Sequence, residues 1–129
     1  MNLQLLDFDC SEDADGVTCW DALAHPHTRH TPALLHEAAQ VLTWAHQWAC
    51  RFHAAGPGPI EDGAEWDFDL QITMHSPGHS TPASASFDAA MGVLRLSPEP
   101  QTGQTLALSL SISGTPGFAQ AFRQRWGAP

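Results

Sequence analysis

The sequence predicts an α+β fold: a two-layer sandwich in which a mainly antiparallel sheet of about six strands, in the order ββαββββα, carries one long helix and a short C-terminal helix on one face. Apolar residues recur with helical spacing in one long segment and alternate with polar residues in several shorter ones. Most links between these segments are short, as antiparallel neighbours require. The chain has the length of one domain, so we expect a single α+β domain over residues 1–129.

The first two strands should form a hairpin. Apolar-rich runs at Leu3–Cys10 and Val17–Ala24 flank a polar stretch that contains Asp15-Gly16. This dipeptide is typical of tight hairpin turns, which need residues that tolerate positive φ angles. We therefore expect the two runs to pair antiparallel.

The long helix follows a polar connection that begins at His25. Thr31 suits the N-cap position and Pro32 suits the first helical position. The apolar positions that follow are spaced by three and four residues, which places them on one helix face. They are Leu34, Leu35, Ala38, Val41, Leu42, Ala45, Trp48, Ala49 and Phe52. Gly56-Pro57-Gly58-Pro59 should end the helix.

Two longer strands show a period of two. From Glu65 to His75, Trp66 begins the apolar side and Asp67 lies on the polar side. The segment Thr105–Ser113 alternates leucine or isoleucine with alanine or serine. Each strand should therefore have one buried and one wet face.

The remaining elements are shorter. Ser76–Pro82 is predicted to be a loop, and Ser84–Asp88 and Gly92–Ser97 are predicted to be two strands around a turn. Thr115-Pro116 repeats the helix-start pattern. The inner side of that last helix should carry Phe118, Ala121, Phe122 and Trp126.

Composition excludes several classes of partner. Apolar residues make up 43% of the chain and charged residues 15%, which is typical of a globular domain. The chain has five basic residues, all arginine, and 14 acidic residues, so the formal net charge is −9. Nucleic acid and anionic membrane surfaces are therefore unsuitable partners, and the longest apolar runs are far too short to span a bilayer.

Compartment is inferred from the N-terminus and the cysteines. The first residues lack the pattern of a signal peptide, so we expect a cytoplasmic protein. Arginine without lysine, together with abundant Ala, Gly and Pro, favours a GC-rich bacterial source. Cys10, Cys19 and Cys50 match no zinc or redox motif, so we expect reduced, mostly buried thiols and no cofactor.

The expected topology separates two kinds of chemistry. The long helix should span about 34 Å at ~1.5 Å per residue, and the strand from Glu65 about 36 Å at ~3.3 Å per residue. If the helix packs back along the sheet, the loops near residues 25–30 and 75–79 meet at one end. The first hairpin turn, the loop after the helix and the start of the third strand then meet at the other.

The first of these ends, which we call the histidine end, contains His25, His27, His30, His75 and His79. Imidazole nitrogens are good ligands for zinc or nickel, so these residues form a candidate metal site. Their spacing matches no known zinc motif, however. The alternatives are solvated loop histidines and a pH sensor, because imidazole titrates near neutrality.

The second, the acidic end, contains Glu12, Asp13, Asp15, Glu61, Asp62 and Glu65, together with Asp9 and Asp67. A docking surface for a basic protein partner would use such a concentration of charge. The alternatives are a weak divalent-cation site and a solvated charge run that aids solubility. The segment Ser11–Gly16 resembles the first half of an EF-hand loop, but Ala22 occupies the twelfth position, where the bidentate Glu is needed, which excludes an EF-hand.

Other candidate sites are weaker. The segments Asp7–Asp9 and Glu65–Asp69 both alternate carboxylates with aromatic residues, but like charges on adjacent strands repel, which suggests that the two strands are not neighbours. The sequence contains no nucleophile elbow, zinc-protease motif or phosphate-binding glycine loop. Trp44 falls off the apolar helix stripe, so it is either an exposed interface anchor or covered by a neighbouring element.

The leading hypothesis is a small, acidic, non-enzymatic protein whose acidic end, with Trp44, binds a protein partner as an interaction or accessory module. The first alternative is a metal-binding protein that uses the loop histidines. The second is a small-ligand binder or enzyme with a pocket between sheet and helix, which a sequence does not reveal. The chain should be a monomer or a homodimer.

Overall fold

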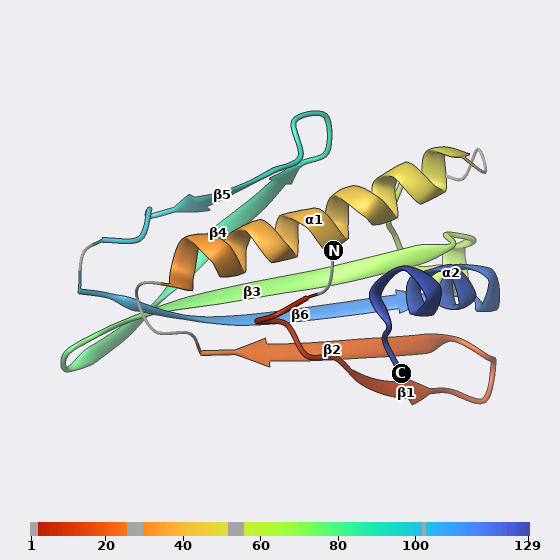
Figure 1. Ribbon diagram of the computed structural model, residues 1–129, viewed down its shortest axis with the longest axis horizontal. Coiled ribbons are helices and arrows are strands. Elements are labelled where there is room, and N and C mark those ends of the chain that lie inside the picture. Colours follow the sequence, from red (N-terminus) through yellow and green to blue (C-terminus); the bar gives the residue numbers. More distant parts are fainter. Residues whose placement is uncertain (1–2, 26–29, 52–55, 102) are drawn as a thin grey trace.

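A computed structural model describes residues 3–25, 30–51, 56–101 and 103–129, and it confirms the predicted α+β class and element order. Six antiparallel strands form one sheet, and a long and a short helix lie on one side of it (Figure 1). The elements are β1 (Asp9–Glu12), β2 (Thr18–Ala24), α1 (Thr31–Arg51), the short 3-10 helix η2 (Ile60–Asp62), β3 (Trp66–Ser76), β4 (His79–Asp88), β5 (Val93–Ser97), β6 (Thr105–Gly114) and α2 (Pro116–Trp126).

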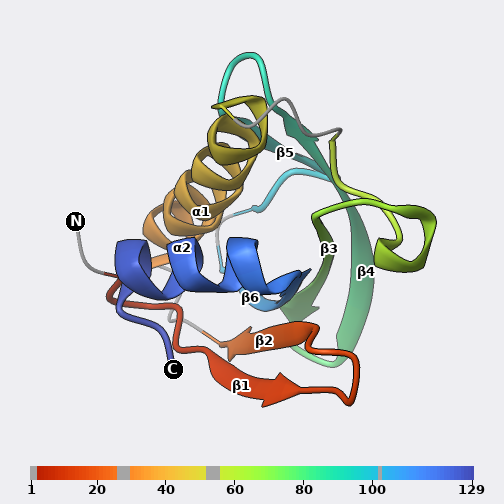
Figure 2. The ribbon, with the colours of Figure 1, turned by 90° about the vertical axis from the view of Figure 1, so that its right-hand side faces the viewer.

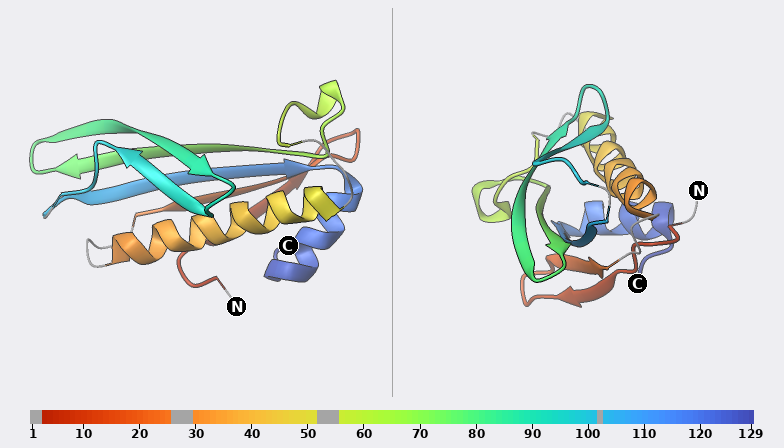
Figure 3. Two further views of the ribbon diagram at one scale, coloured as in Figure 1. Left: turned by 90° about the horizontal axis from the view of Figure 1, so that it is seen from above. Right: turned by 90° about the vertical axis from the view of Figure 1, so that its left-hand side faces the viewer.

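The strands lie side by side in the order β1-β2-β6-β3-β4-β5. Figure 2 shows the sheet curving around the helices, so that β5 lies over α1 while β1 lies on the far side of α2. Figure 3 shows the same curvature from above and from the opposite end. Because β2 and β6 separate β1 from β3, the two carboxylate-bearing segments are not adjacent, as their charges suggested.

The core occupies the concave side of the sheet. The inward residues of β6, namely Leu106, Leu108, Leu110 and Ile112, are fully buried, as the alternation predicted. Phe118 of α2 is also fully buried and contacts the rings of Trp20, Trp44, Trp48, Trp66 and Phe122. A Cβ on Gly114 would collide with the Phe118 ring, which explains glycine at the end of β6.

No helix among the described residues is long and apolar enough to cross a membrane.

The first strand is shorter than predicted. The expected strand Leu3–Cys10 is a strand only from Asp9, and the residues before it pass over the helices instead. The reason is Glu37 of α1, whose buried carboxylate accepts hydrogen bonds from the backbone N–H groups of Gln4, Leu5 and Leu6 at 3.0–3.1 Å. These donors are thereby satisfied without a neighbouring strand.

The start of the long helix also differs in detail from the expectation. The helix begins at Thr31, but the hydroxyl of that buried residue has no hydrogen-bond partner among the described residues. The Thr31 side chain therefore does not act as the predicted N-cap.

The predicted loop Ser76–Pro82 is mostly strand. β3 continues to Ser76 and β4 starts at His79, so the turn contains only Pro77 and Gly78, which has a φ of 87°. Pro82 lies within β4, opposite Thr73. A strand accommodates proline, which has no N–H to donate, where one of its edges is unpaired. β4 has such an edge here, because β5 pairs only with its later half.

The sheet opens between β3 and β4. β4 pairs with β3 through its first five residues and with β5 through Ser84–Asp88, so the two halves of β4 have different partners. The first six residues of β3 consequently have no partner in β4. His46 of α1 lies between the diverging strands, with its ring centroid 5.1 Å from that of Trp66 and 5.3 Å from that of Phe87.

Candidate functional site

The structure gathers several of the predicted acidic residues around one hollow. This hollow has a volume of about 590 Å³. We call it the acidic hollow, and it is lined by Asp13, Asp15, Val17, Pro59, Ile60, Glu61, Asp67, Ser113, Thr115 and Pro116. Its walls come from the β1–β2 turn, the η2 segment and the adjoining ends of β3, β6 and α2.

Local backbone interactions fix the carboxylates at the hollow. In the β1–β2 turn, Oδ1 of Asp13 accepts hydrogen bonds from the backbone N–H groups of Asp15 and Val17 at 2.9 and 3.0 Å. The η2 segment, which carries Glu61, is tied to β3 where the N–H of Gly58 donates to the carbonyl of Trp66. The hollow therefore has a defined shape at both walls.

The charge of the hollow is uncompensated within the described chain. Four of its lining residues are carboxylates, and its described lining contains no arginine. Oδ1 of Asp67 accepts from the backbone N–H of Phe68, and the other oxygen is not used in that bond. The hollow therefore offers negative charge together with the apolar side chains of Val17 and Ile60.

The other predicted partner-binding residues fall outside the lining. Glu12 ends β1 beside Asp13, and Asp62 ends η2 beside Glu61. Glu65 accepts a hydrogen bond of 2.6 Å from the hydroxyl of Thr115, which places it at the rim.

Trp44 lies elsewhere. It is half-buried against α2, with ring centroids 5.7 Å from Phe118, 6.0 Å from Phe122 and 6.4 Å from Trp126. Of the two alternatives for this residue, the structure shows cover by the C-terminal helix.

Acidic and hydroxyl groups continue from the hollow along the convex face of the sheet. Ser113 of β6 faces Asp67, and Ser111 lies between Asp69 of β3 and Asp21 of β2. The Ser111 hydroxyl donates to Asp21. This face is wet, as the alternating pattern predicted.

The cysteines are not buried as expected. Cys10 and Cys50 are exposed and Cys19 is partly exposed, and all three are free thiols. Cys19 lies on the convex face, with its Sγ 3.8 Å from Oδ2 of Asp21. The pKa of the Cys19 thiol is raised mainly by its partial burial, and further by the negative charge of Asp21 and its hydrogen bond with that carboxylate.

The histidine end forms only in part. The rings of His25 and His75 lie 6.4 Å apart, so these two histidines come together near the end of β3. His75 Nδ1 is 2.8 Å from the hydroxyl of Ser80, His79 is exposed, and His30 is half-buried before α1. His27 lies outside the described residues. Among the residues that are described, no three His, Cys, Asp or Glu side chains are placed to hold a metal ion.

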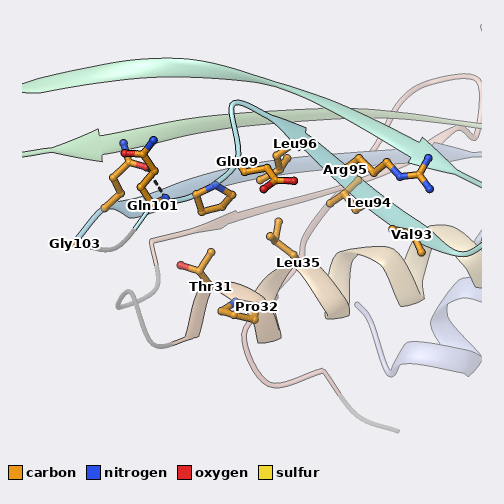
Figure 4. Close-up of a pocket in the computed structure, with 12 residues that line it drawn as sticks. Thr31, Pro32, Leu35, Val93, Leu94, Arg95, Leu96, Glu99, Gln101 and Gly103 are labelled. Atoms are coloured by element: carbon orange, nitrogen blue, oxygen red, sulfur yellow. Dashed lines mark hydrogen bonds between the residues drawn. The ribbon is translucent and has the colours of Figure 1, made fainter.

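A second hollow was not indicated by the sequence. A groove of about 850 Å³ lies between β5, the first turns of α1 and the β5–β6 loop (Figure 4). We call it the β5 groove, and its lining residues are Thr31, Pro32, Leu35, Val93, Leu94, Arg95, Leu96, Glu99, Pro100, Gln101, Gly103 and Gln104. Leucines at helical and strand spacing predict core contacts, and only the curvature of β5 over α1 leaves them lining a groove.

Comparisons with models of known protein families, with curated proteins and with solved structures found no match for this chain.

Proposed function

We propose that this chain is a non-enzymatic protein-interaction module of the bacterial cytoplasm, and that its acidic hollow binds a basic segment of a protein partner. The observation that supports the proposal is the convergence of Asp13, Asp15, Glu61 and Asp67 on one hollow whose described lining has no arginine. The net charge of −9 adds a field of the same sign over the whole chain.

The dimensions of the hollow favour side chains over a bare ion. Calcium binds oxygens at about 2.3–2.6 Å, so its site must be narrow and must draw several carboxylates together. A hollow of about 590 Å³ is instead wide enough for lysine or arginine side chains. Val17 and Ile60 would contact the aliphatic parts of such side chains while the carboxylates pair with their charges.

A charge-neutral variant of the hollow tests the proposal. Asp15→Asn, Glu61→Gln and Asp67→Asn together remove three negative charges but keep side-chain size and an acceptor oxygen, so the Asp67 to Phe68 contact is retained. The partner should be lost from affinity purifications with this triple variant. Association of the purified pair should also weaken as salt is added, because salt screens exposed charges.

The matched control removes three negative charges away from the hollow. It combines Asp7→Asn, Asp21→Asn and Asp88→Asn, none of which lines the acidic hollow or the β5 groove. The control should retain the same partner as the unaltered protein. Retention by the hollow variant, or no specific protein with the unaltered chain, would contradict the proposal.

Photo-crosslinking locates the contact directly. A photoreactive amino acid in place of Ile60 lies in the hollow, whereas one in place of Leu23, which is 68% exposed, lies outside it. The partner should crosslink through position 60 and not through position 23. The reverse result would place the interface on a different surface.

A further inference from the structure

The free edge of β5 faces the β5 groove. β5 is the last strand of the sheet and pairs through all five of its residues with β4. Its side chains alternate between the two faces of the sheet, yet four consecutive residues, Val93 to Leu96, line the groove. A hollow lined by both sets of side chains must run along the edge of the strand, where unpaired backbone N–H and C=O groups point.

The groove has an apolar side suited to alternating side chains. Leu35 of α1 and Leu94 and Leu96 of β5 line it and are only half-buried. Its volume of about 850 Å³ falls within the range of about 300–1,000 Å³ that is common for ligand sites. An added strand would extend the curvature of the sheet over α1 and would cover these leucines.

The charges at the groove indicate which polar side chains a bound segment would carry. Figure 4 shows the Glu99 carboxylate above Leu35, while the Arg95 guanidinium extends away from it along β5. Arg95 pairs with Asp88 at 3.5 Å, and the described residues give Glu99 no ion pair. An occupant with lysine or arginine side chains would therefore complement both Glu99 and the net charge of −9.

We propose that the β5 groove binds an extended peptide segment of a partner protein, in which apolar residues alternate with Lys or Arg, as a seventh strand along β5. A second copy of this chain fits less well, because a twofold pairing centred on β5 would place Arg95 opposite Arg95. The β5 groove shares no lining residue with the acidic hollow, so this inference does not depend on the proposed function.

The probe is a synthetic nine-residue peptide that alternates lysine and leucine. Its binding to the full chain is followed by fluorescence anisotropy and by amide hydrogen exchange of the protein. Backbone pairing should slow exchange of the groove-facing β5 amides at least about tenfold at saturating peptide. The amides of β1, at the other sheet edge, should not change. A peptide with glutamate in place of lysine should bind at least about tenfold more weakly.

Two charge reversals with the same change in net charge locate the peptide. Glu99→Lys should raise the dissociation constant at least about tenfold, and Glu61→Lys, in the acidic hollow, less than about threefold. Both residues are exposed, so neither variant should impair folding. The reverse order would place the peptide in the acidic hollow, which would overturn this inference while agreeing with the proposed function.

Three further results would overturn the proposal. The first is no binding of the lysine–leucine peptide at ~1 mM. The second is binding without slower exchange in β5. The third is a dimer whose β5 amides are already protected without peptide, because a second copy would then cover the edge.

Discussion

The two halves of the sheet are attached to the helices in different ways. On the β1–β2–β6 side, Phe118 and Phe122 of α2 pack against the fully buried ring of Trp20 in β2. On the β4–β5 side, α1 contacts β4 through the rings of His46 and Phe87, and the half-buried leucines of β5 line a groove beside α1. Tight aromatic packing leaves little freedom to adapt, whereas a strand over a half-filled groove can take up another chain.

The two edge strands of the sheet, β1 and β5, also differ in how readily another strand could pair with them. β1 has four residues, all exposed, and its ends are Asp9 and Glu12, so charge discourages another strand from pairing with it. β5 carries Val93, Leu94 and Leu96, and curvature over α1 is what shields its edge. The difference indicates that β1 closes the sheet and that β5 leaves a place for one more strand.

The largest expected effect lies in the aromatic half. Phe118→Ala should lower the free energy of unfolding by about 4 kcal/mol, because it leaves a cavity at a fully buried position next to the fully buried rings of Trp20 and Trp66. Urea unfolding measures this loss. Phe118→Leu, which keeps most of the volume, is the control and should lose about half as much. A loss below about 1 kcal/mol for the alanine variant would show that this half is not tightly packed.

The next effect concerns the segment before β1. Glu37→Ala removes the acceptor of three backbone N–H groups and should cost about 2 kcal/mol in urea unfolding. It should also speed amide exchange at Gln4, Leu5 and Leu6. Glu37→Gln keeps one acceptor oxygen and should cost less. Unchanged exchange at residues 4–6 in the alanine variant would mean that Glu37 does not hold this segment.

The groove half should respond more weakly to the same kind of truncation. Leu94→Ala removes a side chain that is only half-buried, so we expect a loss of about 1 kcal/mol in urea unfolding. Leu110→Ala, at a fully buried position of β6, is the matched control and should lose about 3 kcal/mol. Equal losses at the two positions would remove the distinction between the halves.

The predictable parts of the fold are those determined by local pattern. Alternation in β6 assigns Leu106, Leu108, Leu110 and Ile112 to the core. The carboxylates of the acidic hollow lie in the β1–β2 turn, in η2 and at the start of β3, which the topology brings together. What the pattern misses depends on distant partners. The segment from Leu3 is not a strand because Glu37 binds its N–H groups, and no local signal reports that contact.

The β5 groove was missed for a similar reason. Leu94 and Leu96 have the alternation of any half-buried strand, and their exposure depends on where β4 changes partner. That change depends on pairing across the sheet, which hydrophobic periodicity does not encode. Charged turns are therefore recognisable from sequence, whereas a groove formed by strand curvature requires the structure.

The smallest effect lies where the two halves diverge, at His46 between Trp66 and Phe87. Partial burial against these rings lowers the pKa of His46 below the ordinary histidine value of about 6.5. Well above pH ~6.5 the imidazole is neutral in both folded and unfolded chains, so its burial in the neutral form does not reduce the free energy of unfolding there. As the pH falls below ~6.5, the unfolded chain binds the proton first, and the free energy of unfolding decreases until the folded protein is protonated too.

His46→Phe keeps an aromatic ring between the strands and removes the titration. Between pH 8 and pH 5, urea unfolding should show that the unaltered protein loses slightly more free energy of unfolding than this variant, because His46 is only partly buried. His36→Gln, at an exposed position of the same helix, is the control and should lose as much as the unaltered protein. If His46→Phe shows the same loss as both, the imidazole does not couple pH to the junction of β3 and β4.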